Sequence, residues 1–292
     1  MSADRTQGTR YSLHDGLGER WLTTVAPHGR MEVLALAPVL STQTMSEPAI
    51  RARAARFAAD VDMETIAAVR RVERDGAAVR VLADPAPGVR LSDLLAQLET
   101  GGDMLSHAGM LELASSVVRA LAAVHAMPGG LAHGTVTPAH VAVKADGGVV
   151  LTDAVFGPAL EALQWNRERL WREFGVAMPA SASLPRFDQR ADVTQLGAVV
   201  LAIALRRRLR ADEYPRHAID LVLQATADIS APGTSALRMW LQTALQLHPR
   251  STYASAVDAE RAFGEGVAQP GQRRAGMKAL GSLLQPSRML IA

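Results

Sequence analysis

The chain has 292 residues, of which 48% are hydrophobic and 4% aromatic; it has no cysteine and a formal net charge of +2 at pH 7. Such a length and composition suit one two-lobed domain, or two small ones, with a core of Ala, Val and Leu. The charge gives no sign of nucleic-acid binding, no apolar run reaches the ~20 residues of a membrane span, and the polar start MSADRTQGTRYS is unlike a signal peptide. Because no disulfide or thiolate site can form, the sequence predicts a cytoplasmic location.

The first third of the chain predicts a small antiparallel sheet with one helix. Residues 11–38 alternate short apolar segments with glycine-containing turns, and residues 66–72 and 77–82 have the composition of two more strands. Residues 47–60 are rich in Ala and Arg and favour a helix. Residues 83–89 contain two prolines and a glycine, so they are the predicted hinge to the rest of the chain.

The remaining residues predict a mainly helical region that contains one β-hairpin. The hairpin lies in residues 131–157, where two β-branched runs flank a turn with Asp146 and two glycines. Residues 192–205 are nearly all apolar and are expected to form a buried helix. Other helices are expected at 91–99, 110–125, 158–175, 214–227, 235–246 and 255–263.

The hairpin region resembles the catalytic segment of the protein kinase family. It reads LAHGTVTPAHVAVKADGGVVLTDAVFG, whereas the family has H-R-D-L-K-P-x-N, a short hairpin and then D-F-G. Residues 82–91 are similar to the family's hinge, Asp192 opens a D-V-x-x-L-G segment, and residues 244–249 are similar to its A-L-x-x-D-P segment. The resemblance covers residues 11–263.

This resemblance implies an α+β, two-lobed protein kinase-like fold, with a small five-stranded antiparallel sheet plus a helix followed by a larger, mainly helical lobe. The implied parts are an N-terminal tail at 1–10, an N-lobe at 11–82, a hinge at 83–89, a C-lobe at 90–263 and a linker or tail at 264–292.

Most positions where the family keeps catalytic groups carry other residues here. The strand lysine of V-A-I-K falls at Ala37, and its glutamate partner on the following helix falls near Ala54. The catalytic aspartate falls at Thr135, whose hydroxyl cannot act as a general base at neutral pH. The catalytic-loop lysine falls at Thr137 and the metal-binding asparagine at His140. The arginine before the catalytic aspartate falls at Gly134, and the D-F-G aspartate is retained as Asp153.

The glycine-rich loop that covers phosphates in the family is also altered. Aligned on G-x-G-x-x-G, its glycine positions fall at Gly18, Arg20 and Thr23. A simple β-hairpin fits this segment, yet an arginine there could meet an anion, so Gly18, Arg20 and Asp153 form a candidate weak nucleotide or anion cleft. For His140 and Asp153 we expect a hydrogen-bonded pair, because one carboxylate beside an imidazole is a poor Mg²⁺ site. No metal or cofactor is predicted, and His133 is expected to pack in the core.

Residues 154–180 contain no Ser, Thr or Tyr, so phosphorylation cannot switch this segment. They carry Trp165, Arg169, Trp171 and Phe174 at helix-compatible spacing. Two interpretations are open: the aromatic side chains pack onto the helical lobe, or they form a docking surface for a protein partner, since Trp and Arg are common interface anchors. The arginines at 206–208 and 210 could similarly be a second docking surface or a solvated helix end.

The resemblance and the lost groups together predict a bacterial pseudokinase that binds protein partners without transferring phosphate. The alternatives are a non-catalytic nucleotide or anion sensor that uses the interlobe cleft, and an atypical enzyme that uses the cleft for other chemistry. The tail at 264–292 mixes basic and apolar residues, so it is either a linker or a weak contact with a membrane surface or partner groove.

Overall fold

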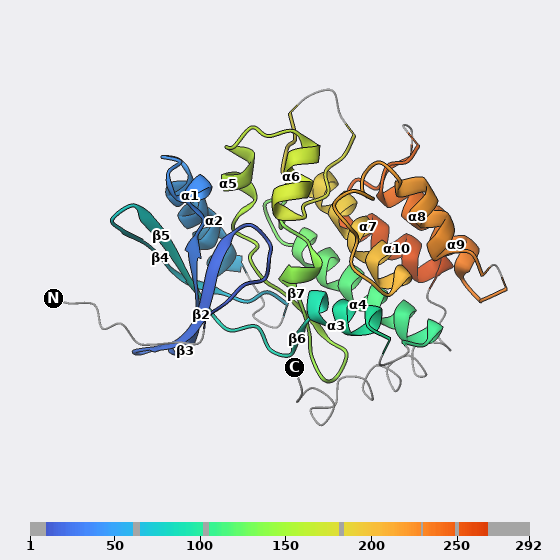
Figure 1. The fold of residues 1–292 in the computed structure, drawn as a ribbon, viewed down its shortest axis with the longest axis horizontal. Helices are drawn as coiled ribbons and strands as arrows, with labels where there is room; N and C mark the ends of the chain where they lie inside the picture. Colours follow the sequence, from blue (N-terminus) through green and yellow to red (C-terminus); the bar gives the residue numbers. More distant parts are fainter. Residues whose placement is uncertain are drawn as a thin grey trace.

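The computed structural model describes residues 10–60, 65–101, 105–180, 184–228, 230–248 and 251–267. Two lobes lie side by side, and a β-sheet with its helices is joined to a larger, mainly helical part (Figure 1). The predicted order of elements is therefore confirmed. The predicted tail falls mostly outside the described residues.

The smaller lobe is a five-stranded antiparallel sheet in the order β1-β2-β3-β5-β4. The strands are β1 (Arg10–Tyr11), β2 (Gly18–Val25), β3 (Gly29–Leu36), β4 (Val69–Asp75) and β5 (Ala78–Ala83). Side chains alternate between the two faces, as the strand repeat requires. Leu34 and Leu36 join the main core, whereas Met31 and Val33 form a small cluster with Leu82.

Two helices follow β3, namely α1 (Pro38–Ser41) and α2 (Ser46–Asp60), and they lie beside the sheet in Figure 1. Helix α2 packs against β4 and against α5 (Gly157–Glu161) of the larger lobe. Two of its arginines extend this contact, because Arg53 donates to the carbonyl oxygen of Ala132 and Arg56 donates to that of Gly129 at 3.1 Å. Helix α2 is therefore fixed to the larger lobe through backbone carbonyls rather than through an ion pair.

The larger lobe combines a small sheet, ordered β6-β7-β8, with a set of helices. Its strands are β6 (Val89–Arg90), β7 (Val141–Val143) and β8 (Val149–Leu151), and the 3-10 helix η1 (Pro138–His140) precedes β7. Its remaining helices are α3 (Leu91–Glu99), α4 (His107–His125), α6 (Arg167–Phe174), α7 (Gln189–Leu205), α8 (Ala218–Ala225), α9 (Thr234–Ala244) and α10 (Ala256–Gly266).

The apolar helices α4 and α7 form the centre of the larger lobe. They pack against each other, and α10 packs against both. Helix α4 is long and apolar enough to cross a membrane by composition, but 78% of its 18-residue window is buried inside this fold. A core helix of a globular domain has these properties. Helix α7 begins with Asp188, whose side chain accepts a hydrogen bond from the backbone N–H of Ala191, as expected of an N-cap.

Three elements differ from the sequence prediction. The single helix expected at 158–175 is split into α5 and α6, because Gln164 has a positive φ of 52° and Asn166 caps a new helix start. Ile66 forms only an isolated parallel bridge with Leu151, and β4 begins at Val69. Helix α8 begins at Ala218, since the preceding residues form turns.

Candidate functional site

The space between the lobes is filled by charged side chains that come from six separate segments. They are Asp15 from the β1–β2 loop, Arg20 from β2, Glu32 from β3, Arg90 from β6, His140 at the end of η1, and Asp153 just after β8. All but Asp153 and Arg90 belong to the buried class, and the side chains of these two are only 9% and 10% exposed. We call these six residues the interlobe cluster.

Arg20 lies at the centre of the interlobe cluster and is only 1% exposed. Its Nη2 donates to Asp15 Oδ2 at 2.9 Å, and its Nη1 donates to Glu32 Oε1 at 2.8 Å and to Asp153 Oδ1 at 3.1 Å. Three carboxylates thus face one guanidinium. Such multiple, charge-assisted hydrogen bonds are among the strong ones in proteins.

Two further cations balance the carboxylates. Arg90 Nη2 donates to both oxygens of Glu32 at 3.0 and 3.2 Å, and Arg90 Nη1 donates to the hydroxyl of Thr152. The ring of His140 has Nδ1 2.6 Å from the carbonyl oxygen of Thr135 and Nε2 2.9 Å from Asp15 Oδ2. Both ring nitrogens therefore face acceptor oxygens, and the imidazolium form donates to both. With that form, three cationic groups match three carboxylates.

The cluster controls the ionisation of its members. Burial alone would raise the pKa of the Asp15 carboxyl, but the hydrogen bond from His140 and the charge of Arg20 lower it to about 2. Burial likewise opposes ionisation of Asp153, yet Arg20, His140 and Arg90 hold its pKa below the usual range. Burial alone would lower the pKa of Arg20, but the three carboxylates have the larger effect and raise it. These contacts therefore favour the charged forms of Asp15, Asp153 and Arg20.

The segment expected to match the glycine-rich loop is a strand. Residues from Gly18 onward form β2, which pairs along its whole length with β3 from Gly18↔Leu36 to Val25↔Gly29. The simple β-hairpin interpretation is therefore the arrangement found. Arg20 is engaged with carboxylates of its own chain, so the expected anion cleft at Gly18, Arg20 and Asp153 is not an open one.

The positions aligned with the family's strand lysine and its glutamate partner do not contribute to the interlobe cluster. Ala37 lies just beyond β3, where it is the N-cap residue of α1. Ala54 lies on α2 and packs against the main core. Glu32 is instead the buried β3 side chain that enters the cluster. A carboxylate on this strand thus meets two arginines, whereas the family has a lysine on it.

The catalytic-loop positions are buried and held by the fold. The Thr135 hydroxyl is buried and donates to the backbone carbonyl of Asp153 at 2.8 Å. A neutral hydroxyl is too weak a base to take a proton from a substrate. Gly134 has φ of 89°, and a Cβ there would lie 2.7 Å from the Cα of Gly157, which explains why no side chain is accommodated. Thr137 is also buried, with 4% of its surface exposed.

His133 packs in the core as expected. It is 0% exposed, and burial lowers the pKa of its imidazole to about 4. The carboxylate of Asp192, at the start of α7, accepts hydrogen bonds from the backbone N–H groups of His133 and Gly134 and lies 2.9 Å from His125 Nε2. Asp192 thus fixes the loop to the buried helix.

The expected His140–Asp153 hydrogen bond is not the one observed. The His140 Nε2 lies 3.9 Å from Asp153 Oδ2, beyond hydrogen-bond distance, and its partner is Asp15. The sequence prediction named the wrong carboxylate because Asp15 is 125 positions away in the chain. In the part of the chain that the structure describes, no group of three or more His, Asp or Glu side chains is placed to hold a metal ion.

The four residues proposed for partner binding contact their own domain to different degrees. Phe174 is 2% exposed and stacks on Trp165 with ring centroids 5.5 Å apart. Trp171 is half-buried and packs on Tyr214 with centroids 4.7 Å apart. Arg169 is exposed and lies 3.6 Å above the ring of Trp165. Trp165 and Arg169 are thus the accessible pair.

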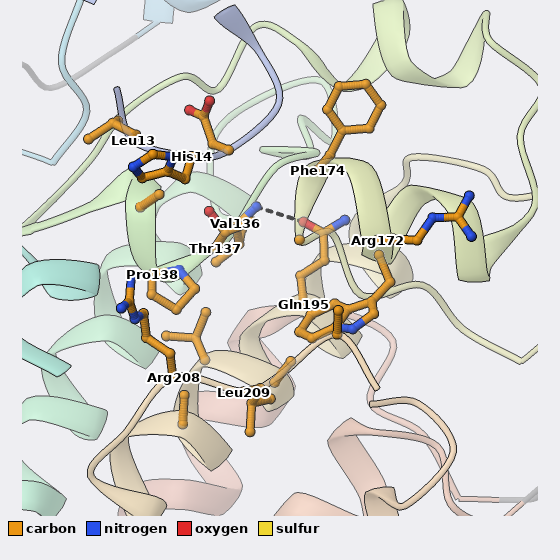
Figure 2. A pocket seen from close by; sticks show the side chains of 18 of the residues that line it. Leu13, His14, Val136, Thr137, Pro138, Arg172, Phe174, Gln195, Arg208 and Leu209 are labelled. Carbon is orange, nitrogen blue, oxygen red and sulfur yellow. Dashed lines mark hydrogen bonds between the residues drawn. The ribbon is translucent and has the colours of Figure 1, made fainter. Parts of the chain in front are cut away.

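A cavity of about 210 Å³ adjoins the interlobe cluster. It lies between the β1–β2 loop, the catalytic loop, the end of α6, and helix α7 with the segment after it. Figure 2 shows Leu13, Thr137, Pro138, Phe174 and Arg208 around it, with the backbone N–H of Val136 bonded to Gln195 Oε1 at 2.7 Å. The β1–β2 loop is pressed against α6, because a Cβ on Gly16 would lie 2.0 Å from the carbonyl oxygen of Glu173.

Sequence reasoning missed half of the interlobe cluster. Asp15, Glu32 and Arg90 carry no motif, and each resembles an ordinary surface charge in the sequence. One usable signal was that Arg20 and Glu32 occupy inward-facing positions of β2 and β3, where apolar residues are expected. A charge at a buried position needs a partner, so these two residues pointed to an ion pair.

The comparisons with known proteins agree with this architecture. No protein-family model matches the sequence, and a search of curated proteins finds no match. Solved structures of the PknI kinase domain of Mycobacterium tuberculosis are similar. A double mutant is 19% identical with a TM-score of 0.58, covering 87% of this chain and 92% of that chain. A second structure is 17% identical with a TM-score of 0.57, covering 86% and 91%. A third is 20% identical with a TM-score of 0.55, covering 86% and 91%.

At this level of identity the likeness concerns the fold, and the chain has the two-lobed protein kinase-like fold.

Proposed function

We propose that this domain is a pseudokinase: it does not transfer phosphate and acts as a protein-interaction or regulatory scaffold. The observation that carries the proposal is the engagement of Asp153. Its carboxylate accepts hydrogen bonds from Arg20 and from the Thr152 hydroxyl, at 3.1 and 2.7 Å. In the protein kinase mechanism the corresponding aspartate holds Mg²⁺. Here a guanidinium supplies the positive charge beside it.

The groups missing around Asp153 support the same conclusion. No lysine precedes Lys144, so no lysine of the smaller lobe can contact α- and β-phosphates. Thr135 replaces the catalytic base and its hydroxyl is committed to a backbone carbonyl. Loss of a general base costs about 10²–10⁴-fold in rate, and loss of a charge-stabilising group about 10²–10³-fold. These effects are not additive, but either one leaves a typical kinase very slow.

A phosphate-transfer assay tests the proposal directly. The purified domain is incubated with γ-labelled ATP, Mg²⁺ or Mn²⁺, and generic protein substrates, beside a kinase of known activity. We expect no transfer to itself or to substrate. Metal-dependent transfer that is lost in Asp153→Asn would overturn the proposal. If neither the wild-type domain nor Asp153→Asn transfers phosphate, the result agrees with the proposal.

A nucleotide titration tests the sensor alternative. Arg20 is 1% exposed and its charge is matched by Asp15, Glu32 and Asp153, so ATP or ADP would have to displace these contacts. We expect no change in the melting temperature at millimolar ATP, with or without Mg²⁺. A dose-dependent rise that disappears in Arg20→Met would support the sensor instead.

We assign partner binding to the accessible pair Trp165 and Arg169. A Trp that is half-buried on its own domain, with an Arg stacked above it, offers a large contact area at low entropy cost. Affinity capture from a bacterial lysate, compared between the wild-type domain and Arg169→Ala, tests this assignment. Arg261→Ala, which changes an exposed arginine on α10, is the matched control. Equal capture by both variants would rule out the pair.

The bacterial origin and cytoplasmic location are further parts of the proposal. The similar solved structures are mycobacterial kinase domains, which supports the first. The second is a prediction of the sequence alone.

A further inference from the structure

The cavity beside the interlobe cluster has mostly apolar walls. Helix α7 contributes Ala198, Val199 and Ala202, which are all at least nine-tenths buried, and Leu13 and Pro138 face them from the two loops (Figure 2). A volume of about 210 Å³ corresponds to roughly seven water molecules at liquid density. The cavity is thus large enough for a small organic molecule and too small for a peptide segment.

Two buried polar atoms of the wall lack hydrogen-bond partners among the described residues. They are the hydroxyl of Thr137 and the indole Nε1 of Trp171. Both residues line this cavity. Buried polar groups in folded proteins are nearly always paired, so two such atoms in one wall point to a missing partner. The indole N–H is only a donor, and the hydroxyl can also donate. The absent partner is therefore an acceptor.

Several acceptors in the same wall are already used. Gln195 Oε1 accepts from the backbone N–H of Val136, and Asp15 accepts from Arg20, His140 and the backbone N–H of Leu17. Glu173, at the edge of the cavity, pairs with Arg172 at 3.3 Å. The Thr137 hydroxyl and the Trp171 indole N–H are thus the buried polar groups of this wall for which the described chain supplies no partner.

One of the arginines clustered after α7 adds a cation at the edge. Arg206 donates to the carbonyl oxygen of Leu105, Arg207 pairs with Glu213 at 2.8 Å, and Arg210 lies 3.7 Å from Glu99. Arg208 is exposed and lines the cavity, and no carboxylate of the described chain lies within 4.0 Å of its guanidinium. Figure 2 shows it close to Pro138 and Leu209.

We propose that this cavity binds a small carboxylic acid with a compact apolar body. Its carboxylate pairs with Arg208 and accepts a hydrogen bond from the cavity wall, and its apolar part lies against Ala198, Val199 and Ala202. A carboxylate provides acceptor oxygens and a negative charge at once, which matches both the unpartnered donors and the arginine. The site does not depend on whether the interlobe cleft transfers phosphate.

Calorimetric titration with benzoate and hexanoate, and with benzamide and hexanamide as neutral counterparts, tests the proposal. We expect saturable binding of at least one carboxylate, accompanied by a change in tryptophan fluorescence because Trp171 lies in the wall. Arg208→Gln should weaken carboxylate binding about tenfold or more, since a hydrogen bond to a charged group is lost. The binding of the matching amide should change little in this variant.

Two variants make the result specific. Arg210→Gln removes an exposed arginine from the same segment but outside the cavity, and it should bind like the wild type. Ala198→Leu fills the cavity and should abolish binding, with thermal unfolding used to verify that the variant is folded. The proposal is overturned if none of the four probes binds at 10 mM, or if Arg208→Gln and Arg210→Gln weaken binding equally. Binding of an acidic peptide in place of all four probes would also overturn it.

Discussion

Replacing Arg20 with methionine should strongly destabilise the domain. Arg20 is buried and is the common partner of Asp15, Glu32 and Asp153, at 2.9, 2.8 and 3.1 Å. Methionine retains much of the side-chain volume but leaves three carboxylates in a buried site with Arg90 as the remaining arginine of the cluster. Breaking a buried ion pair by removing one partner costs about 3–5 kcal/mol. In a domain of this size each kcal/mol lowers the melting temperature by roughly 2–4 °C, so we expect a fall of about 10 °C.

The assay is thermal and urea unfolding of Arg20→Met beside a matched control. Arg30→Met is suitable, because Arg30 is an exposed arginine on the neighbouring strand, and its loss should change the unfolding free energy by about 0.5 kcal/mol or less. The deficit of Arg20→Met should be smaller at pH 5 than at pH 8, because protonating one of the crowded carboxylates relieves their repulsion.

A double-mutant cycle separates the ion pair from simple loss of packing. Asp153→Asn in the Arg20→Met background removes one of the uncompensated charges, so the double variant should be more stable than the sum of the single effects by about 1 kcal/mol or more. Additive effects, or an Arg20→Met variant as stable as Arg30→Met, would refute the account of the interlobe cluster.

Three further predictions concern pH and loop packing. The pKa of Asp15 is about 2 in the folded protein, below the ordinary aspartate value of 3.8. The unfolding free energy should therefore fall by about 2 kcal/mol from this group as the pH drops from about 4 to 2, and Arg20→Met should flatten that slope. The pKa of His133 is lowered from 6.5 to about 4 in the folded protein. The unfolding free energy should therefore also fall as the pH drops from 6.5 to 4, by up to about 3 kcal/mol. Denaturant titrations should show this loss, and His133→Asn should remove it. Gly16→Ala should lower the melting temperature clearly more than Gly29→Ala does. Both glycines have a positive φ, but only at Gly16 would the added Cβ meet the backbone, 2.0 Å from the carbonyl oxygen of Glu173. Equal costs would show that the β1–β2 loop does not depend on its contact with α6.

The sequence was sufficient for the arrangement of elements in the chain. Hydrophobic periodicity and turn residues are local properties, so helix α3 was predicted with its observed ends and the strands β4 and β5 within a few residues. Strands β2 and β3 lie inside the sheet segment predicted at 11–38. The resemblance to the kinase family placed His133 in the core, and the structure shows it buried there. The split between α5 and α6 was missed, because the positive φ of Gln164 is a conformation that only the packed structure imposes.

The contents of the interlobe space depended on tertiary structure. Arg20 and Asp153 are 133 positions apart, and Asp15 and His140 are 125 apart, so no local pattern links them. The resemblance indicated which of the family's positions carry other residues here, but only the packed lobes showed that arginines and carboxylates of the chain itself meet between the lobes. The physical reason is that a charged side chain is stable in a buried site only with partners at hydrogen-bond distance, and the folding of the whole chain determines which charges meet there.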